Sequence, residues 1–270
     1  MKYELAKAPG SFGDKEVLLH YFTPEKGGLG PAVLILHGVH GRACPGEGNK
    51  YGFLAGELAS KGYDVCIAES SRLRRDKESF DDRSEWAFAA FRGKTFAMEL
   101  FDACSALRSF REKYPGSRAV LWGFSLGGII GALIAGKKAA EIVSRAGLQS
   151  PADIGLEGLV VSGSGDELRP EAELSLRLPV LDSLCHRSEL HEAASRASLD
   201  FALFFYGTLD ESFSEASSRR IFDRLPLDAG RKEFCIIDGA DHPFRNKNGA
   251  PSAAPLMAML AKTTETLGRY

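Results

Sequence analysis

Short apolar runs alternate with amphipathic segments along most of the chain. The runs are nearly continuous in apolar residues, which is typical of strands that are buried on both faces of a sheet. An earlier run at 16–24 is expected at the edge of the sheet, as one strand of an antiparallel pair. The remaining strands are expected at 32–38, 64–70, 119–125, 158–164, 201–207 and 233–239.

Helical spacing separates the apolar runs. Apolar residues recur at intervals of three and four in 51–59, before Gly62, and again in 96–110, before the sequence YPG. Strands that alternate with helices in this way indicate a parallel sheet covered by helices, the α/β class. Further helices are expected directly after Ser125, near 214–225 and from about 252.

One segment, 166–198, interrupts the alternation. It is charged, mostly helical in character, and lies between two predicted strands. Open α/β sheets bind ligands at the carboxyl ends of their strands, so we interpret the segment as a lid inserted over that edge. A peripheral helical hairpin that only packs on the domain is the alternative. No linker or repeat divides the chain, so residues 1–270 are expected to form a single domain.

Composition narrows the class of protein further. The chain has 270 residues, 44% hydrophobic and 26% charged, which is typical of a soluble globular protein. A net charge of -2 gives no electrostatic footprint for nucleic acid. The stretch 1–22 lacks the apolar core of a signal peptide, and no apolar run is long enough to span a membrane. The scattered, unpaired cysteines argue against a disulfide framework and predict a cytoplasmic protein. They are Cys44, Cys66, Cys104, Cys185 and Cys235.

The sequence GFSLG, residues 123–127, places Ser125 between a predicted strand and a predicted helix. This is the context that the motif G-x-S-x-G requires, because a tight strand-to-helix turn projects the serine hydroxyl. Side chains in place of Gly123 and Gly127 would meet neighbouring backbone. The position at a helix N-terminus also favours an anion. We interpret Ser125 as a nucleophile, with a simple turn and cap residue as the alternative.

Polar residues also follow the last two predicted strands. Asp210 lies in FYGTLDESF and His242 in DGADHPF, each just past a strand. A serine hydroxyl is a poor nucleophile until a base takes its proton, and that base needs a carboxylate to orient it. The order Ser125, Asp210, His242 therefore suggests a triad. Taken singly, Asp210 also suits a helix cap and His242 an ordinary loop.

The sequence LHGVHG, residues 36–41, follows the first central strand and is similar to HG-x-x-G oxyanion loops. With the motifs above, the chain resembles the α/β-hydrolase fold serine hydrolases, an esterase- and lipase-like superfamily, over about residues 30–245. The resemblance implies a mostly parallel eight-stranded sheet flanked by helices and a Ser–His–Asp triad. It also implies an oxyanion hole formed by the backbone amides of Val39 and Leu126.

The function that follows is hydrolysis of carboxylic esters through an acyl-enzyme, with no metal or organic cofactor. A peptidase resembling the prolyl-oligopeptidase catalytic domain, a thioesterase or an acyltransferase would use the same triad. A non-catalytic binding protein on this fold is a further alternative. The expected partner is a small ester or acyl substrate, with no nucleic acid and no membrane span, and the sequence leaves open whether the chain forms a homodimer.

Several residues have less certain roles. Asp166 is the rival acid, because some proteins of this fold carry the carboxylate one strand earlier. We expect His40, Trp86 and Phe88 to contact the substrate, although core packing explains the aromatic pair equally well. His186 and His191 are not spaced as zinc ligands on one helix face.

The run 71–86 is rich in charge of both signs. It offers Arg72 or Arg74 as groups that hold an anionic substrate, but the interleaved acidic residues favour a solvated surface.

Overall fold

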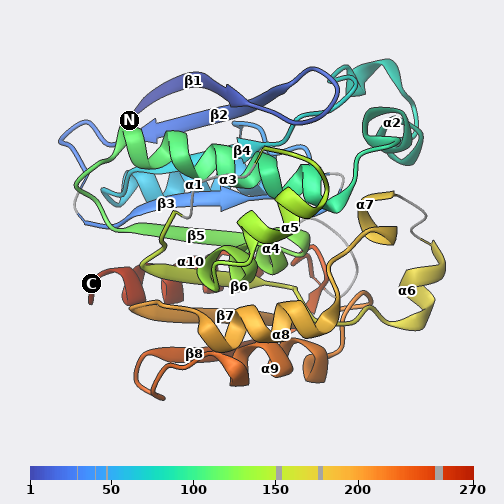
Figure 1. The fold of residues 1–270 in the computed structure, drawn as a ribbon. Coiled ribbons are helices and arrows are strands. Elements are labelled where there is room, and N and C mark those ends of the chain that lie inside the picture. Colours follow the sequence, from blue (N-terminus) through green and yellow to red (C-terminus); the bar gives the residue numbers. More distant parts are fainter. Residues whose placement is uncertain (29, 40, 47, 150–153, 176–178, 247–251) are drawn as a thin grey trace.

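The computed structural model describes residues 1–270 except 29, 40, 47, 150–153, 176–178 and 247–251 (Figure 1). In the described chain the strands form one eight-stranded sheet in the order β1-β2-β4-β3-β5-β6-β7-β8. The first strands pair antiparallel, β1 with β2 and β2 with β4, and the rest of the sheet is parallel. The strands are β1 (Lys2–Pro9), β2 (Glu16–Thr23), β3 (Ala32–Leu36), β4 (Val65–Glu69), β5 (Ala119–Phe124), β6 (Gly158–Ser162), β7 (Phe201–Leu209) and β8 (Lys232–Asp241).

Helices cover both faces of the sheet. On one face lie α1 and α10, which contact each other; on the other lie α3, α4, α5, α8 and α9 (Figure 1). Their bounds are α1 (Lys50–Ser60), α3 (Phe96–Lys113), α4 (Leu126–Ala135), α5 (Ala139–Arg145), α8 (Arg187–Arg196), α9 (Glu215–Arg224) and α10 (Ala253–Leu267). Shorter helices lie beyond the carboxyl end of the parallel strands (Figure 1). They are α2 (Arg83–Phe91), α6 (Pro170–Ser175) and α7 (Pro179–Asp182), and the 3₁₀ turn η1 spans Lys77–Ser79.

The continuous apolar strands are explained by a core on each side of the sheet. Along β3, Leu34 packs into the core beneath α3 and α4, whereas Val33 and Ile35 pack into the core beneath α1 and α10. All three side chains are fully buried. Because consecutive strand residues face opposite sides, both faces must be apolar. The predicted fold class is confirmed.

The structure adds β1, η1, α2 and α5 to the predicted elements and divides the segment 166–198. The first strand, β1, carries mostly exposed residues and pairs only with β2, so it has no apolar run to reveal it. The segment 166–198 divides into α6 and α7, near the carboxyl edge, and α8, which packs on α4 and α9. The buried residues Leu190, Ala193 and Ala194 make α8 part of the helical layer rather than of a lid.

All five cysteines have free thiols. Within the described ranges, none of the helices is both long and apolar enough to cross a membrane.

Candidate active site

Ser125 lies in the turn between β5 and α4, with backbone angles of φ 51° and ψ −115°. Positive φ is unusual for a residue with a side chain and costs energy unless the surroundings enforce it. Here the Ser125 N–H donates to the Ser162 carbonyl at 2.8 Å, and the Ser164 hydroxyl donates to the Ser125 carbonyl at 2.6 Å. Both ends of the residue are therefore held from the end of β6.

The glycines on either side of Ser125 are required by close backbone contacts. A Cβ on Gly123 would lie 2.2 Å from the carbonyl oxygen of Gly127, and a Cβ on Gly127 would lie 2.7 Å from that of Leu36. Real Cβ atoms do not approach oxygen so closely. The turn is therefore tight enough to admit only hydrogen at both positions.

The structure brings Ser125, His242 and Asp210 together. His242 Nε2 lies 3.1 Å from Ser125 Oγ, and His242 Nδ1 lies 3.0 Å from Asp210 Oδ2. Because a carboxylate can only accept, Nδ1 carries the hydrogen and Nε2 is free to accept from the serine hydroxyl. Asp210 also accepts from the backbone N–H groups of Ser212 and Phe213 at 2.8 and 2.9 Å. With 3% of its surface exposed, this carboxylate is fixed where it orients the imidazole.

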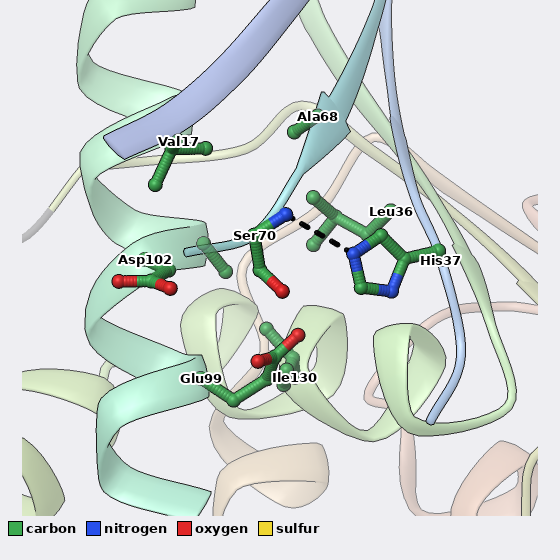
Figure 2. Close-up of a pocket in the computed structure, with 9 residues that line it drawn as sticks. Val17, Leu36, His37, Ala68, Ser70, Glu99, Asp102 and Ile130 are labelled. Atoms are coloured by element: carbon green, nitrogen blue, oxygen red, sulfur yellow. Dashed lines mark hydrogen bonds between the residues drawn. The ribbon is translucent and has the colours of Figure 1, made fainter. Parts of the chain in front are cut away.

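The loop after β3 approaches Ser125 from the other side. His37 is buried; its Nε2 accepts from the Ser70 N–H at 3.1 Å and its Nδ1 donates to the Gly38 carbonyl at 2.7 Å (Figure 2). Burial lowers the pKa of His37, so the neutral ring that these bonds require is favoured. The Gly38 carbonyl also accepts from the Gly41 N–H at 3.0 Å. This peptide is therefore held in one orientation.

The orientation of that peptide decides where the next amide points. In a trans peptide the C=O of one residue and the N–H of the next point in opposite directions. With the Gly38 carbonyl directed at His37 and Gly41, the Val39 N–H is directed away from them. Val39 and Leu126, the first residue of α4, both line the cavity at Ser125. Neither amide donates to another residue in the described part of the chain.

The comparisons with known proteins concern the fold. The family model described as alpha/beta hydrolase fold matches residues 31–164, from the start of β3 to beyond β6. This chain is an α/β-hydrolase-fold protein. A search of curated proteins gives no significant match in sequence.

Solved structures share this fold over nearly the whole length of the chain. Thermogutta terrifontis esterase 2 is 17% identical with a TM-score of 0.67, covering 99% of this chain and 94% of its own. The dienelactone hydrolase from Anabaena variabilis is 15% identical with a TM-score of 0.62, covering 100% and 99%. The monoacylglycerol lipase of Paleococcus ferrophilus is 18% identical with a TM-score of 0.57, covering 98% and 100%. At these identities the likeness is one of fold.

A cavity of about 1100 Å³ surrounds Ser125 and His242 in this α/β-hydrolase. Leu181 and Leu184, in and after α7, line one side of it together with Leu168, before α6. The residues on α1, α2 and the loop after β8 line another side. The space is large enough for a small organic substrate.

The rival acid, Asp166, lies elsewhere. Its carboxylate bonds to His191 Nε2 at 2.6 Å, to Arg187 Nε at 2.9 Å and to Arg220 Nη2 at 2.6 Å. Burial acts to raise the pKa of Asp166, but the hydrogen bonds from Arg220 and His191 and the charges of Arg220 and Arg187 hold it below its usual value. The Asp166 carboxylate therefore bonds to these three side chains and not to His242.

The aromatic candidates are not among the described residues that line the cavity. Trp86 is fully buried against Phe91 and the Arg72 guanidinium, and Phe88, 51% exposed, faces solvent. The sequence pattern predicts no helix over 83–91, so it does not show which of these side chains faces inward. His40 lies outside the described residues.

The charged run after β4 is only partly a solvated surface. Arg74 pairs with Asp76 in solvent, as expected. Arg72, in contrast, is 0% exposed and pairs with Glu69 at 2.9 Å. Neither arginine lines the cavity. No spacing in the sequence distinguishes the buried arginine from its exposed neighbours, because the partner that neutralises it lies in the preceding strand.

The structure adds site residues that no motif indicated. Ser162 and Ser164 hold the backbone of Ser125, and Glu211 accepts from the His242 N–H at 3.3 Å. All lie at or just after the carboxyl ends of strands, which is the one signal that the sequence carried for them. Within the described ranges, no group of three or more His, Cys, Asp or Glu side chains is arranged to hold a metal ion.

Proposed function

We propose that this protein is a serine hydrolase that cleaves carboxylic esters through an acyl-enzyme. The observation that carries the proposal is the chain of contacts from Asp210 through His242 to Ser125, opening into one large cavity. The similar fold of an esterase and of a monoacylglycerol lipase supports the choice of esters as the substrate class.

In the proposed reaction, His242 Nε2 accepts the proton of the Ser125 hydroxyl as Oγ attacks the acyl carbonyl. Asp210 stabilises the resulting imidazolium and keeps Nε2 directed at the serine. The carbonyl oxygen becomes negatively charged and accepts from the amides of Val39 and Leu126, which have no other acceptor among described residues. His242 then gives its proton to the leaving alcohol. A water molecule, deprotonated by His242, releases the acid and restores Ser125.

The test is covalent labelling of the purified protein with a fluorophosphonate, combined with hydrolysis of 4-nitrophenyl esters. We expect a label on Ser125, and a loss of kcat on the order of 10⁴–10⁶ in Ser125→Ala, because triad members act as a unit. Ser84→Ala is a matched control, since Ser84 lines the same cavity but lacks a base partner. A folded Ser125→Ala protein that keeps a tenth of the rate or more contradicts the proposal.

The same experiment separates the related functions. An acyl thioester and a peptide anilide are assayed beside the esters, because a Ser–His–Asp triad also cleaves these bonds. Esters are expected to give the highest kcat/KM. A folded protein that turns over none of these substrates and takes no label would instead be a binding protein on the same fold.

A further inference from the structure

The walls of the active-site cavity differ in charge. The leucines at α7 supply an apolar part of the lining, whereas basic side chains from α1, α2, η1 and the loops after β3 and β8 supply another part. Glu211 is the one acidic residue among the described residues that line the cavity. The basic lining residues are Arg42, Lys50, Lys77, Arg83 and Arg245.

Two of these cations are already neutralised. Arg42 pairs with Glu78 at 2.6 Å, and Arg245 pairs with Asp241 at 2.7 Å. Lys50, Lys77 and Arg83 have no carboxylate within ion-pair distance in the part of the chain that the structure describes. This part of the lining therefore has a surplus of positive charge, although the whole chain has a net charge of -2.

Lys50 contacts residues that adjoin Ser125 and His242 in the sequence. Its ammonium lies over the rings of Phe124 and Tyr51, at 4.6 and 5.1 Å from their centroids. Its Nζ reaches the carbonyl of Pro243 only at 3.4 Å, a long hydrogen bond. Phe124 precedes Ser125 and Pro243 follows His242. The ammonium is thus partly buried beside the triad without a strong acceptor.

The surroundings of Lys50 disfavour its charged form. Burial lowers the pKa of Lys50 most, Arg83 on α2 and Arg245 after β8 also lower it, and Asp241 at the end of β8 raises it; together they bring this pKa to about 7. The rings of Tyr51 and Phe124 complete its contacts. An anion placed between Lys50 and Arg83 would supply the missing acceptor and the missing negative charge.

We propose that the substrate is an ester that also carries an acidic group, a carboxylate or a phosphate, which Lys50 and Arg83 bind while the scissile carbonyl lies at Ser125. This inference rests on the proposed ester hydrolysis. The proposed substrate places an apolar portion against the leucines at α7 and an anionic portion against α1 and α2.

The first test uses matched pairs of esters. One pair, 4-nitrophenyl hydrogen glutarate and its neutral methyl ester, varies charge on the acyl side. A second pair, 3-carboxyphenyl butyrate and its methyl ester, varies charge on the alcohol side, and a third replaces that carboxylate by phosphate. We expect kcat/KM to favour the charged member of at least one pair by about tenfold or more, as for a hydrogen bond between charged groups.

Variants then assign the preference to the two cations. Lys50→Met and Arg83→Met are each expected to remove most of the charged-to-neutral ratio. Lys61→Met is the matched control, because Lys61 is exposed just beyond the other end of α1 and should leave the ratio unchanged. A ratio of one in every pair, or a preference that survives both cavity substitutions, overturns the proposal.

The pH dependence supplies a readout that a purely structural role would not move. The same catalytic groups cleave both members of a pair, so any effect of pH on those groups cancels in the ratio. As pH rises through about 7, Lys50 loses its proton, and the preference for the charged ester is expected to fall. A ratio that is constant from pH 6 to about 9 contradicts the role of Lys50.

A final measurement does not depend on turnover. The pKa of Lys50, followed by NMR of the reductively methylated protein, should rise when glutarate or inorganic phosphate is added, with Lys61 as the internal reference. If none of the esters is hydrolysed but the pKa of Lys50 rises, the anion site is supported and the proposed esterase function is contradicted. If esters are hydrolysed but neither anion moves the pKa and no pair shows a preference, only the anion site fails.

Discussion

Ser125 adopts a backbone conformation that its own side chain disfavours, and its neighbours determine that conformation. Hydrogen bonds to Ser162 and Ser164 fix both of its peptide groups. The close backbone contacts of Gly123 and Gly127 leave no room for a side chain at either position. Strain of this kind persists where the surroundings over-determine it, most often at functional sites. The hydroxyl is thereby kept beside His242 before any substrate binds.

At the same scale, the two carboxylates Asp210 and Asp166 should respond differently to the same substitution. Asp210→Asn presents an amide to His242 Nδ1 and allows the wrong tautomer, so we expect kcat to fall by a factor on the order of 10⁴. Asp166→Asn disturbs only the ion pairs with Arg187, Arg220 and His191, and kcat should stay within about threefold.

Steady-state hydrolysis of a 4-nitrophenyl ester by both purified variants checks this prediction, with circular dichroism to show that each is folded. A folded, inactive Asp166→Asn protein beside an active Asp210→Asn protein would assign the acid to the earlier strand.

At the scale of elements, three parallel strands bring the candidate triad to one edge of the sheet. Ser125 follows β5, Asp210 follows β7 and His242 follows β8, and these strands lie in the order β5-β6-β7-β8. Parallel strands end at the same edge, so residues far apart in sequence meet there. The described parts of the stretch 168–184 lie at this edge as well and line the cavity through Leu168, Leu181 and Leu184.

The leucines of this stretch should set the preference for acyl length. Leu181→Ser and Leu184→Ser replace apolar lining by hydroxyl groups, so each added methylene of the substrate gains less from burial. Since a buried methylene contributes about 0.8 kcal/mol, the ratio of kcat/KM for octanoate over acetate should fall by about tenfold in the double variant.

Leu5→Ser is the control for this effect, because Leu5 is an exposed leucine on β1, far from the cavity lining. Both proteins should keep their reaction with a small fluorophosphonate. An unchanged chain-length profile in the double variant would mean that the leucines only pack on the domain.

At the scale of the whole molecule, a buried ionic cluster joins segments that are distant in sequence. Asp102 on α3 accepts from Ser11 in the β1–β2 hairpin, from Ser71 after β4 and from Lys94 before α3. Lys94 also pairs with Glu99 at 2.5 Å. Lys94 and Asp102 are fully buried. Close to this cluster lies the small cavity at His37, which contains the carboxylates of Glu99 and Asp102 in its wall (Figure 2).

Removing the lysine of this cluster should destabilise the whole fold. Lys94→Met leaves two buried carboxylates without their cation, and breaking a buried pair in this way costs about 3–5 kcal/mol. Lys7→Met is the control, because it breaks an exposed pair with Glu16 and should change stability by less than about 1 kcal/mol.

Urea unfolding at neutral pH, followed by circular dichroism, gives the free energy of unfolding for each protein. Equal losses in the Lys94 and Lys7 variants would contradict a structural role for the cluster.

The sequence by itself determined the fold class and the order of the candidate triad. Continuous apolar strands can be buried only in a sheet covered on both faces, and the glycines around Ser125 permit only a tight turn. These are local properties, and each can be recognised within a few residues. The edge strand β1 could not be recognised in this way, because it is mostly exposed and carries no continuous apolar run.

Only the tertiary structure decided which charges and aromatic rings face the cavity. Arg72 and Arg74 stand in one run, yet Arg72 is buried against Glu69 while Arg74 is in solvent. Trp86 packs against Phe91. Lys50, which no motif indicated, lies over the ring of Phe124. The physical reason is that the environment of a charged or aromatic side chain is set by its partners. Those partners come from other strands and helices, and no local pattern in the sequence records them.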